Sequence, residues 1–244
     1  MADYADVNGM RMYYAVRGKG PVLVLLHSGL GNGLQFIRQI PAFEKQYRLV
    51  IPDMRAQGRT PDREGPISYH AMAEDVIALM NRLGVQRFDV MGWSDGGNCG
   101  IDLAIHHRDR VKHLVTFGAN ASPDGVRPQD RAWLDTVTVA SLGNDVRAGW
   151  MALAPDPRQY DEAMGKLLHM WRTEPRFTAK ELGSIKAKAL ICAGENDIVR
   201  RDHTESLARS IPKAELWIIP GASHGAIQEK PDDVNAKVLQ FLAR

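Results

Sequence analysis

Short apolar runs recur along the chain, and each has the length of a β-strand. Residues 22–26 are unbroken Val-Leu-Val-Leu-Leu, which is typical of a strand buried on both faces of a sheet. Comparable runs follow at residues 47–51, 88–91, 111–117, 189–193 and 215–219. Residues 11–16 alternate apolar and polar positions instead, which predicts a strand with one exposed face. The pattern therefore predicts a largely buried sheet.

Helical segments separate these strands. The clearest spans residues 68–83: Ser68 is a predicted N-cap and Gly84 a predicted C-terminal stop. Its apolar positions fall on one helical face: Met72, Val76, Leu79, Met80 and Leu83. A second helix is predicted at residues 98–107. Alternating strands and helices predict an α/β fold with a parallel sheet covered by helices.

The alternation breaks between residues 117 and 189, where prolines separate segments that look helical. Three of the five tryptophans, Trp133, Trp150 and Trp171, lie in this part of the chain. We therefore expect residues 121–183 to form a helical cap inserted into a core made of residues 1–120 and 184–244. The tryptophans are expected to bury the insertion's own helices, because core burial is the commonest use of aromatic residues.

Charge and composition exclude several classes of protein. Lys+Arg is 31 and Asp+Glu is 29, so the formal net charge is only +2, which gives no basic surplus for binding nucleic acid. The apolar run at residues 22–26 is far too short to span a membrane. The chain starts without an apolar signal segment, and Cys99 and Cys192 sit in apolar surroundings that predict buried, reduced thiols. A cytoplasmic location is expected, and nothing in the pattern indicates an oligomeric state.

The strongest chemical signal is Gly-Trp-Ser-Asp-Gly at residues 92–96. It follows a predicted strand and precedes a predicted helix, which is the context that a nucleophile elbow needs. Ser94 would stand on a sharp turn above the carboxyl edge of the sheet. Glycines two residues before and after it would relieve the crowding that such a turn imposes. The sequence therefore predicts Ser94 as a nucleophile.

A serine nucleophile needs a base, and the expected chain order is Ser, then Asp or Glu, then His. His224 lies in a loop of small residues directly after the strand predicted at 215–219, so we expect it to be the base. His203, at the start of a helix, is expected to have a solvated surface role. Asp197 follows the strand predicted at 189–193 and is the favoured orienting acid, with Glu195 and Asp124 as competitors.

Stabilisation of a developing oxyanion requires backbone N–H groups close to the nucleophile. One is expected from Asp95, the residue after Ser94, and a second from Gly29 in the loop after residues 22–26, with Leu30 as the alternative. His27 is expected to brace this loop through hydrogen bonds. No His, Cys or Asp cluster shows the spacing of metal ligands, so neither a metal nor a cofactor is expected.

These motifs together resemble the α/β-hydrolase family, and within it the valacyclovir hydrolase (biphenyl hydrolase-like) group. The matching segments are His-Ser-Gly at 27–29, Asp-Met-Arg-Ala-Gln-Gly at 53–58, Met-Gly-Trp-Ser-Asp-Gly-Gly at 91–97, Phe-Gly-Ala-Asn-Ala at 117–121, Gly-Glu-Asn-Asp at 194–197 and Gly-Ala-Ser-His at 221–224. The resemblance implies a mostly parallel eight-stranded sheet flanked by helices, a helical cap, and cofactor-free hydrolysis through an acyl-enzyme. Ser28 and Ala56 replace glycines that are common in the family. Relatives that open epoxides or displace halide carry Asp in place of Ser94.

The resemblance also bears on the residues beside the nucleophile. In the valacyclovir hydrolase group, the acid after the serine resembles a site for the substrate's α-amino group. Asp95 would then pair with an ammonium; alternatively, it only caps the following helix, where a negative charge is favoured. Trp93 and Leu30 are expected to contact the substrate.

The sequence favours hydrolysis of small-molecule carboxylic esters. A narrower version of this hypothesis is an esterase that prefers α-amino acyl esters. A lactonase or enol-lactonase, or a hydrolase of C–C bonds, would use the same machinery. A receptor that binds small molecules without turnover is the alternative from another class, since fold does not fix function.

Overall fold

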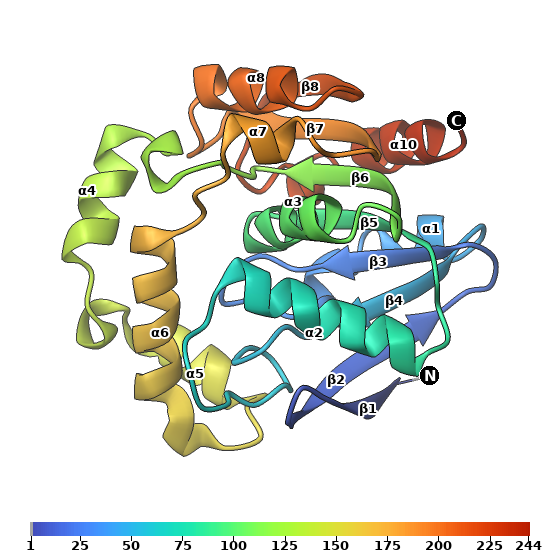
Figure 1. The fold of residues 1–244 in the computed structure, drawn as a ribbon. Coiled ribbons are helices and arrows are strands. Elements are labelled where there is room, and N and C mark those ends of the chain that lie inside the picture. The colour runs from blue at the N-terminus through green and yellow to red at the C-terminus, as the bar shows by residue number, and fades with distance from the viewer. Residues whose placement is uncertain (1) are drawn as a thin grey trace.

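The computed structural model describes residues 2–244 and contains one eight-stranded sheet in the order β1-β2-β4-β3-β5-β6-β7-β8 (Figure 1). Met1, where the predicted core begins, lies outside the described residues. The pairs β1–β2 and β2–β4 are antiparallel, and the other neighbours are parallel. The strands are β1 (Ala2–Val7), β2 (Met10–Arg17), β3 (Val22–Leu26), β4 (Arg48–Pro52), β5 (Phe88–Trp93), β6 (Val111–Phe117), β7 (Lys188–Asn196) and β8 (Ala214–Ser223).

Helices cover both faces of this sheet. On one face lie α2 (Tyr69–Arg82), α3 (Asp95–His106) and α8 (Arg201–Ser210); on the other lie α1 (Ile40–Phe43), α9 (Ala226–Glu229) and α10 (Pro231–Leu242). Strand β3 shows why its apolar run is continuous. Val24 and Leu26 point into the first layer, while Leu23 and Leu25 point into the second, and all four are fully buried.

The predicted strands are found, and one further strand was missed. Strand β1 pairs with β2 through the turn Asn8-Gly9, in which both residues have positive φ (47° and 82°). Asn-Gly is the usual pair for a two-residue hairpin turn, so the sequence did carry a signal for β1. Most residues of β1 are exposed and only Ala5 and Val7 are buried, so the alternation of apolar and polar positions is too short to predict a strand.

The helix predicted at 68–83 is confirmed as α2. The Ser68 side chain accepts a hydrogen bond from the Ala71 N–H, and Gly84 ends the helix at φ +67°. Helix α3 begins at Asp95, three residues before the predicted start, because it follows the Ser94 turn directly. Both cysteines are buried and free, as expected: Cys99 in α3 and Cys192 in β7. Within residues 2–244, no helix is long and apolar enough to cross a bilayer.

The segment between β6 and β7 is helical. It contains α4 (Pro128–Thr136), α5 (Asn144–Met151), α6 (Tyr160–Thr173) and α7 (Ala179–Leu182), with short 3-10 turns between them. Figure 1 shows α4, α5 and α6 together beyond the carboxyl ends of the strands. The last helix, α7, packs instead against α3 and α8 on the flank of the sheet.

The tryptophans of this segment make different contacts, and Trp150 packs as expected against a helix of its own segment, with its ring 5.5 Å from that of Tyr160 in α6. The Trp150 indole N–H donates to the Ala56 carbonyl at 2.8 Å and so ties α5 to the turn after β4. That turn has φ +61° at Ala56, which explains why glycine is common there. Trp133 is 53% exposed, and Trp171 reaches Asp95, the residue after Ser94.

Candidate active site

Ser94 lies on the tight turn between β5 and α3, with φ +54° and ψ −116°. Steric crowding around it is severe. A Cβ added to Gly92 would lie 2.1 Å from the Gly96 carbonyl oxygen, and one on Gly96 would lie 2.0 Å from the Leu26 carbonyl oxygen. Glycine at both positions therefore lets backbone pack on backbone and holds Ser94 in a left-handed conformation that non-glycine residues rarely adopt.

This crowding gives a direct prediction. Gly96→Ala is expected to lower the free energy of unfolding by about 3 kcal/mol or more, because its Cβ meets rigid backbone atoms. Gly165→Ala is the matched control: this glycine is also helical, and a Cβ there meets nothing within 4 Å, so it should stabilise by about 0.5–1 kcal/mol. Urea unfolding followed by circular dichroism measures both. Equal stability of the two variants would contradict the packing described for Gly96.

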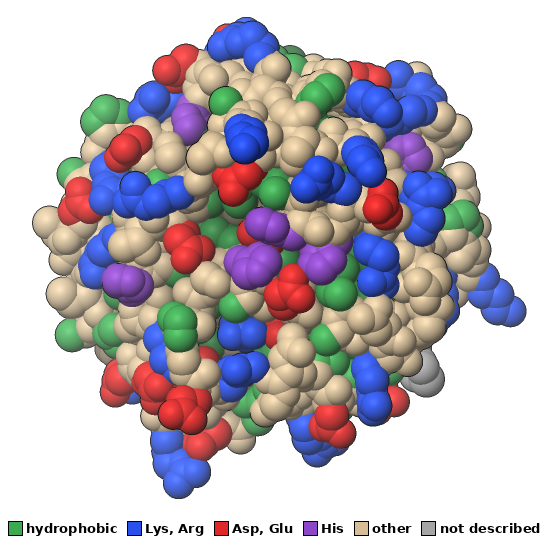
Figure 2. Space-filling model, viewed as in Figure 1, with side chains coloured by type: hydrophobic (Ala, Val, Ile, Leu, Met, Phe, Trp, Pro, Cys, Tyr) green, Lys and Arg blue, Asp and Glu red, His purple; other side chains and the backbone are tan. Residues whose placement is uncertain are grey.

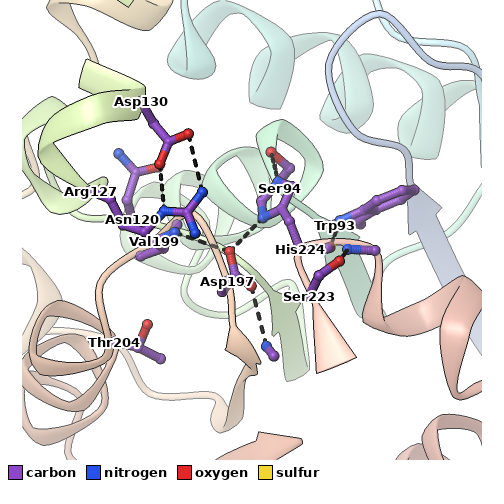
Figure 3. A network of polar contacts seen from close by, with 12 residues as sticks. Trp93, Ser94, Asn120, Arg127, Asp130, Asp197, Val199, Thr204, Ser223 and His224 are labelled. Carbon is purple, nitrogen blue, oxygen red and sulfur yellow. Dashed lines mark hydrogen bonds and ion pairs between the residues drawn. The ribbon is translucent and has the colours of Figure 1, made fainter. Parts of the chain in front are cut away.

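The structure brings together the three residues that the sequence singled out. His224 Nε2 lies 3.0 Å from Ser94 Oγ, and His224 Nδ1 lies 2.6 Å from Asp197 Oδ1 (Figure 3). The Asp197 side chain is 2% exposed and that of His224 is 21% exposed. A buried carboxylate holds the imidazole, whose other nitrogen faces the serine, and this arrangement can remove the hydroxyl proton.

Asp197 is fixed by the backbone at the end of β7. Its Oδ1 also accepts the Val199 N–H at 3.0 Å, and its Oδ2 accepts the Gly194 N–H at 3.2 Å. Because both oxygens accept backbone donors, the carboxylate cannot rotate away from His224. The close-up view in Figure 3 shows this set of bonds around Asp197.

The competing acids lie elsewhere. Glu195 is exposed, and its Oε2 accepts the Gly221 N–H at 2.8 Å. Asp124 is also exposed and has no contact with His224. The expected surface role of His203 is wrong: its ring is partly buried, burial lowers its pKa, and Nε2 accepts the Ala121 N–H at 2.9 Å. His203 therefore braces the chain that leaves β6.

The loop that carries His224 is held from two sides. The Trp93 indole N–H donates to the His224 carbonyl at 2.7 Å, and Glu229 accepts the Ser223 N–H at 2.7 Å. Glu229 also accepts the Ser223 hydroxyl. Trp93 thus positions the histidine loop from behind and does not line the cavity at Ser94, contrary to the expected substrate contact.

Backbone donors are available beside Ser94. Among residues 2–244, the N–H groups of Gly29, Leu30 and Asp95 form no hydrogen bond with the protein. His27 braces their loop as expected: its Nε2 accepts the Met54 N–H at 2.8 Å, so its Nδ1 carries the proton and donates to Ser28 O at 2.7 Å. Burial lowers the pKa of His27, which keeps the ring neutral.

The carboxylate of Asp95, at the start of α3, is buried between α2 and α6. Its Oδ1 accepts the Tyr69 hydroxyl at 2.8 Å, and its Oδ2 accepts the Trp171 indole N–H at 2.8 Å. Burial raises the pKa of Asp95, and these two hydrogen bonds oppose that rise. No basic side chain among the described residues pairs with it, and it makes no side-chain cap bond to α3.

A cavity of about 260 Å³ opens over Ser94. Leu30 lines it, as expected, together with Gly29, Asp95 and His224. Cavity residues that the sequence did not identify as site residues come from α2, the segment between β6 and β7, and the loop after β7: Tyr69, Asn120, Val126, Trp133, Leu134, Trp171, Ile198 and Val199. The only available signal was the cluster of tryptophans in the insertion.

Comparisons with known proteins identify the family of this chain. A family model for the alpha/beta hydrolase fold matches residues 21–138. The putative carbamate hydrolase RutD of Caulobacter sp. (strain K31) is 30% identical over 95% of this chain and 96% of its own length. The serine hydrolase BPHL of Mus musculus is 28% identical over 97% of this chain and 84% of its own length.

A solved structure is similar along the whole chain. The enol-lactonase from Burkholderia xenovorans LB400 has a TM-score of 0.80 and 25% identity, covering 99% of this chain and 100% of that one. BPHL among the relatives confirms the resemblance to the biphenyl hydrolase-like group. Full-length sequence similarity and the eight-stranded sheet lead to the same conclusion: the chain belongs to the α/β-hydrolase family.

Proposed function

We propose that the protein is a serine hydrolase that cleaves carboxylic esters of small molecules through an acyl-enzyme, with Ser94, His224 and Asp197 as its catalytic triad. The observation that carries this proposal is the continuous chain of contacts from Ser94 Oγ through both nitrogens of His224 to Asp197, at 3.0 and 2.6 Å. Nucleophile, base and orienting acid are the three groups that acyl transfer by serine requires.

In the first half of the reaction, Ser94 Oγ attacks the ester carbonyl while its proton moves to His224 Nε2. Asp197 stabilises the resulting imidazolium. The free N–H groups of Gly29 and Asp95 receive the oxyanion of the tetrahedral intermediate, with Leu30 N–H as the alternative to Gly29. His224 then returns the proton to the leaving alcohol, and the acyl group remains on Ser94.

In the second half, His224 takes a proton from water as the water oxygen attacks the acyl carbonyl. His224 then returns this proton to Ser94 Oγ while the bond between Oγ and the acyl group breaks, and the acid leaves. Each proton moves between His224 Nε2 and an oxygen atom, so the cycle needs no cofactor. Residues 121–183 act in this proposal as the cap that closes the cavity over the acyl group, with Trp133 and Trp171 supplying apolar surface.

Asp95 supports a preference for acyl groups that carry an α-amine. It is a buried carboxylate next to the nucleophile, its two hydrogen-bond donors are neutral, and it lines the cavity. A substrate ammonium there would gain a charge-assisted hydrogen bond. The same negative charge opposes binding of an anionic carbamate, although several relatives are named putative carbamate hydrolases.

The test compares kcat/KM for two esters of one alcohol, a valyl ester and the isovaleryl ester that lacks the amine. The valyl ester is expected to be preferred by about tenfold or more. Asp95→Asn should remove that preference, whereas Asp124→Asn, at an exposed acid, should keep it. A ratio near one in the unmodified protein would contradict the ammonium contact but leave ester hydrolysis in place.

Lactone hydrolysis is a second candidate, favoured by the full-length similarity to an enol-lactonase. The same triad opens a cyclic ester, and the leaving alcohol then stays attached to the acyl group. The test is a panel of lactones and of diketones that can be cleaved at a C–C bond. The identified products separate these reactions from plain ester cleavage. A receptor without turnover would hydrolyse no member of the panel.

A further inference from the structure

A second group of chemically capable side chains lies on the surface shared by α2 and α3. Asp102 and His106 are one helical turn apart on α3, and His70 approaches them from α2. His70 Nδ1 lies 2.9 Å from Asp102 Oδ1, and His106 Nε2 lies 3.8 Å from Asp102 Oδ2. Figure 2 shows histidine side chains gathered with acidic ones near the centre of this face. None of these three residues lines the cavity at Ser94.

The three donor atoms are close enough to share one ion. One nitrogen or oxygen from each residue lies within 4.8 Å of the other two. Bonds of about 2.0–2.2 Å to zinc place neighbouring tetrahedral ligands about 3.4 Å apart. The observed 2.9 and 3.8 Å lie on either side of that value. The side chains of His70 and His106 are 55% and 43% exposed, so both rings can rotate to close the remaining gap.

The charge of Asp102 favours a cation at this place. Its side chain is 6% exposed, and among the described residues its ionic partners are the two histidines. The carboxylate thus lacks a permanent positive partner whenever both rings are neutral, and a divalent ion would supply one.

We propose that His70, Asp102 and His106 form a binding site for a divalent transition-metal ion of the Zn²⁺ type. Two imidazoles and one carboxylate suit zinc, nickel or copper and disfavour magnesium and calcium, which prefer oxygen ligands. His70 would bind the metal through Nδ1 as the neutral tautomer with its proton on Nε2, and a ring that carries two protons would release one of them to solvent. Water completes the coordination on the exposed side.

The neighbouring residues define which side chains belong to the site. Glu74 lies one turn after His70 on α2, but it is paired with His107, whose Nε2 is 2.6 Å from Glu74 Oε1. Glu174 accepts the Tyr69 N–H at 3.0 Å. Both acids already have partners, so the site has three protein ligands. The spacing of residues along the chain does not indicate this cluster, because His70 lies 32 residues before Asp102, on another helix.

Metal binding would clamp α2 to α3. Helix α3 begins at the nucleophile's neighbour Asp95, and Tyr69, the residue before His70, donates to the Asp95 carboxylate. The site therefore lies on the two helices that hold Asp95 in place. Zinc is expected to raise the unfolding temperature, because it binds the folded arrangement and the separated helices cannot supply the same ligand set.

The experiment uses the full chain without an affinity tag, stripped with EDTA and exchanged into metal-free buffer. Calorimetric titration with ZnCl₂ is expected to saturate at one ion per chain, and CoCl₂ should give a visible absorption band. His106→Gln and Asp102→Asn should each weaken zinc affinity by more than about tenfold. His106→Gln changes an exposed side chain, so it tests the site even if Asp102→Asn does not fold.

Two matched controls locate the ion. His169→Gln removes an exposed histidine outside the cluster and should leave zinc affinity unchanged. His224→Ala removes the histidine at Ser94 and should also leave it unchanged. Absence of saturable binding would overturn the proposal. So would zinc binding that survives both cluster variants, or that His224→Ala abolishes.

Discussion

Ser94→Ala is expected to lower kcat for hydrolysis of a p-nitrophenyl ester by about 10⁶-fold, which leaves a residual rate roughly 10³–10⁴-fold above that of the reagent in water. Within residues 2–244, Ser94 Oγ is the only hydrogen-bond partner of His224 Nε2, at 3.0 Å, so no other hydroxyl is placed to take its role. The residual rate would come from the cavity and the free N–H groups of Gly29 and Asp95 alone.

The variant should fold normally, because alanine has the same backbone requirements as serine at φ +54°. Ser206→Ala, on the exposed face of α8, is the control and should keep the full rate. A fluorophosphonate probe should label the unmodified protein and the control but not Ser94→Ala. Ester hydrolysis at an undiminished rate by Ser94→Ala would mean that another residue is the nucleophile.

Those parts of the structure that depend on neighbours in the sequence could be predicted. Strand β3 is an unbroken apolar run, α2 has its own cap and stop residues, and the Ser94 turn needs glycines two residues away on each side. The chain order of Ser94, Asp197 and His224 also follows from the strands that precede them, because parallel strands end at one edge of the sheet.

Other features depend on partners far away in the sequence and could not be predicted. Asp95 is bound by Tyr69 from 26 residues before it and by Trp171 from 76 residues after it. The apolar periodicity of α6 does not determine which other helices its apolar face contacts. The prediction that Trp93 contacts the substrate failed for a related reason. A residue beside Ser94 can face either the cavity or the loop behind it, and the Trp93 indole N–H donates to the His224 carbonyl in that loop.

The residue on which the predicted substrate preference depends, Asp95, also lies where α3 contacts α2 and α6. Its carboxylate joins α3, α2 and α6 through two hydrogen bonds, and a Cβ on Gly29 would lie 2.7 Å from both Asp95 and the Trp171 ring. The oxyanion loop, the acid and the cap therefore meet at one point. We expect an ammonium bound to Asp95 to lie close to Trp171, which donates to the same carboxylate.

Asp197→Asn is expected to lower kcat by about 10⁴-fold while leaving Ser94 and His224 in place. Asp197 Oδ1 accepts from His224 Nδ1 and the Val199 N–H, and Oδ2 accepts from the Gly194 N–H. An amide has only one acceptor oxygen, so its NH₂ group must face a donor at one of these positions. If it faces His224, the imidazole adopts the tautomer with its proton on Nε2 and can no longer accept the Ser94 proton.

Glu195→Gln is the matched control, two residues earlier at the end of the same strand, with a carboxylate that is exposed and bonded to Gly221 rather than to His224. Its kcat should stay within about twofold of the unmodified protein, since a surface change of this kind has a small effect. Steady-state kinetics of both variants, with unfolding temperatures to confirm that they fold, decide the assignment. A larger fall in Glu195→Gln than in Asp197→Asn would transfer the orienting role to Glu195, because only the residue that fixes the His224 tautomer can have an effect of this size on kcat.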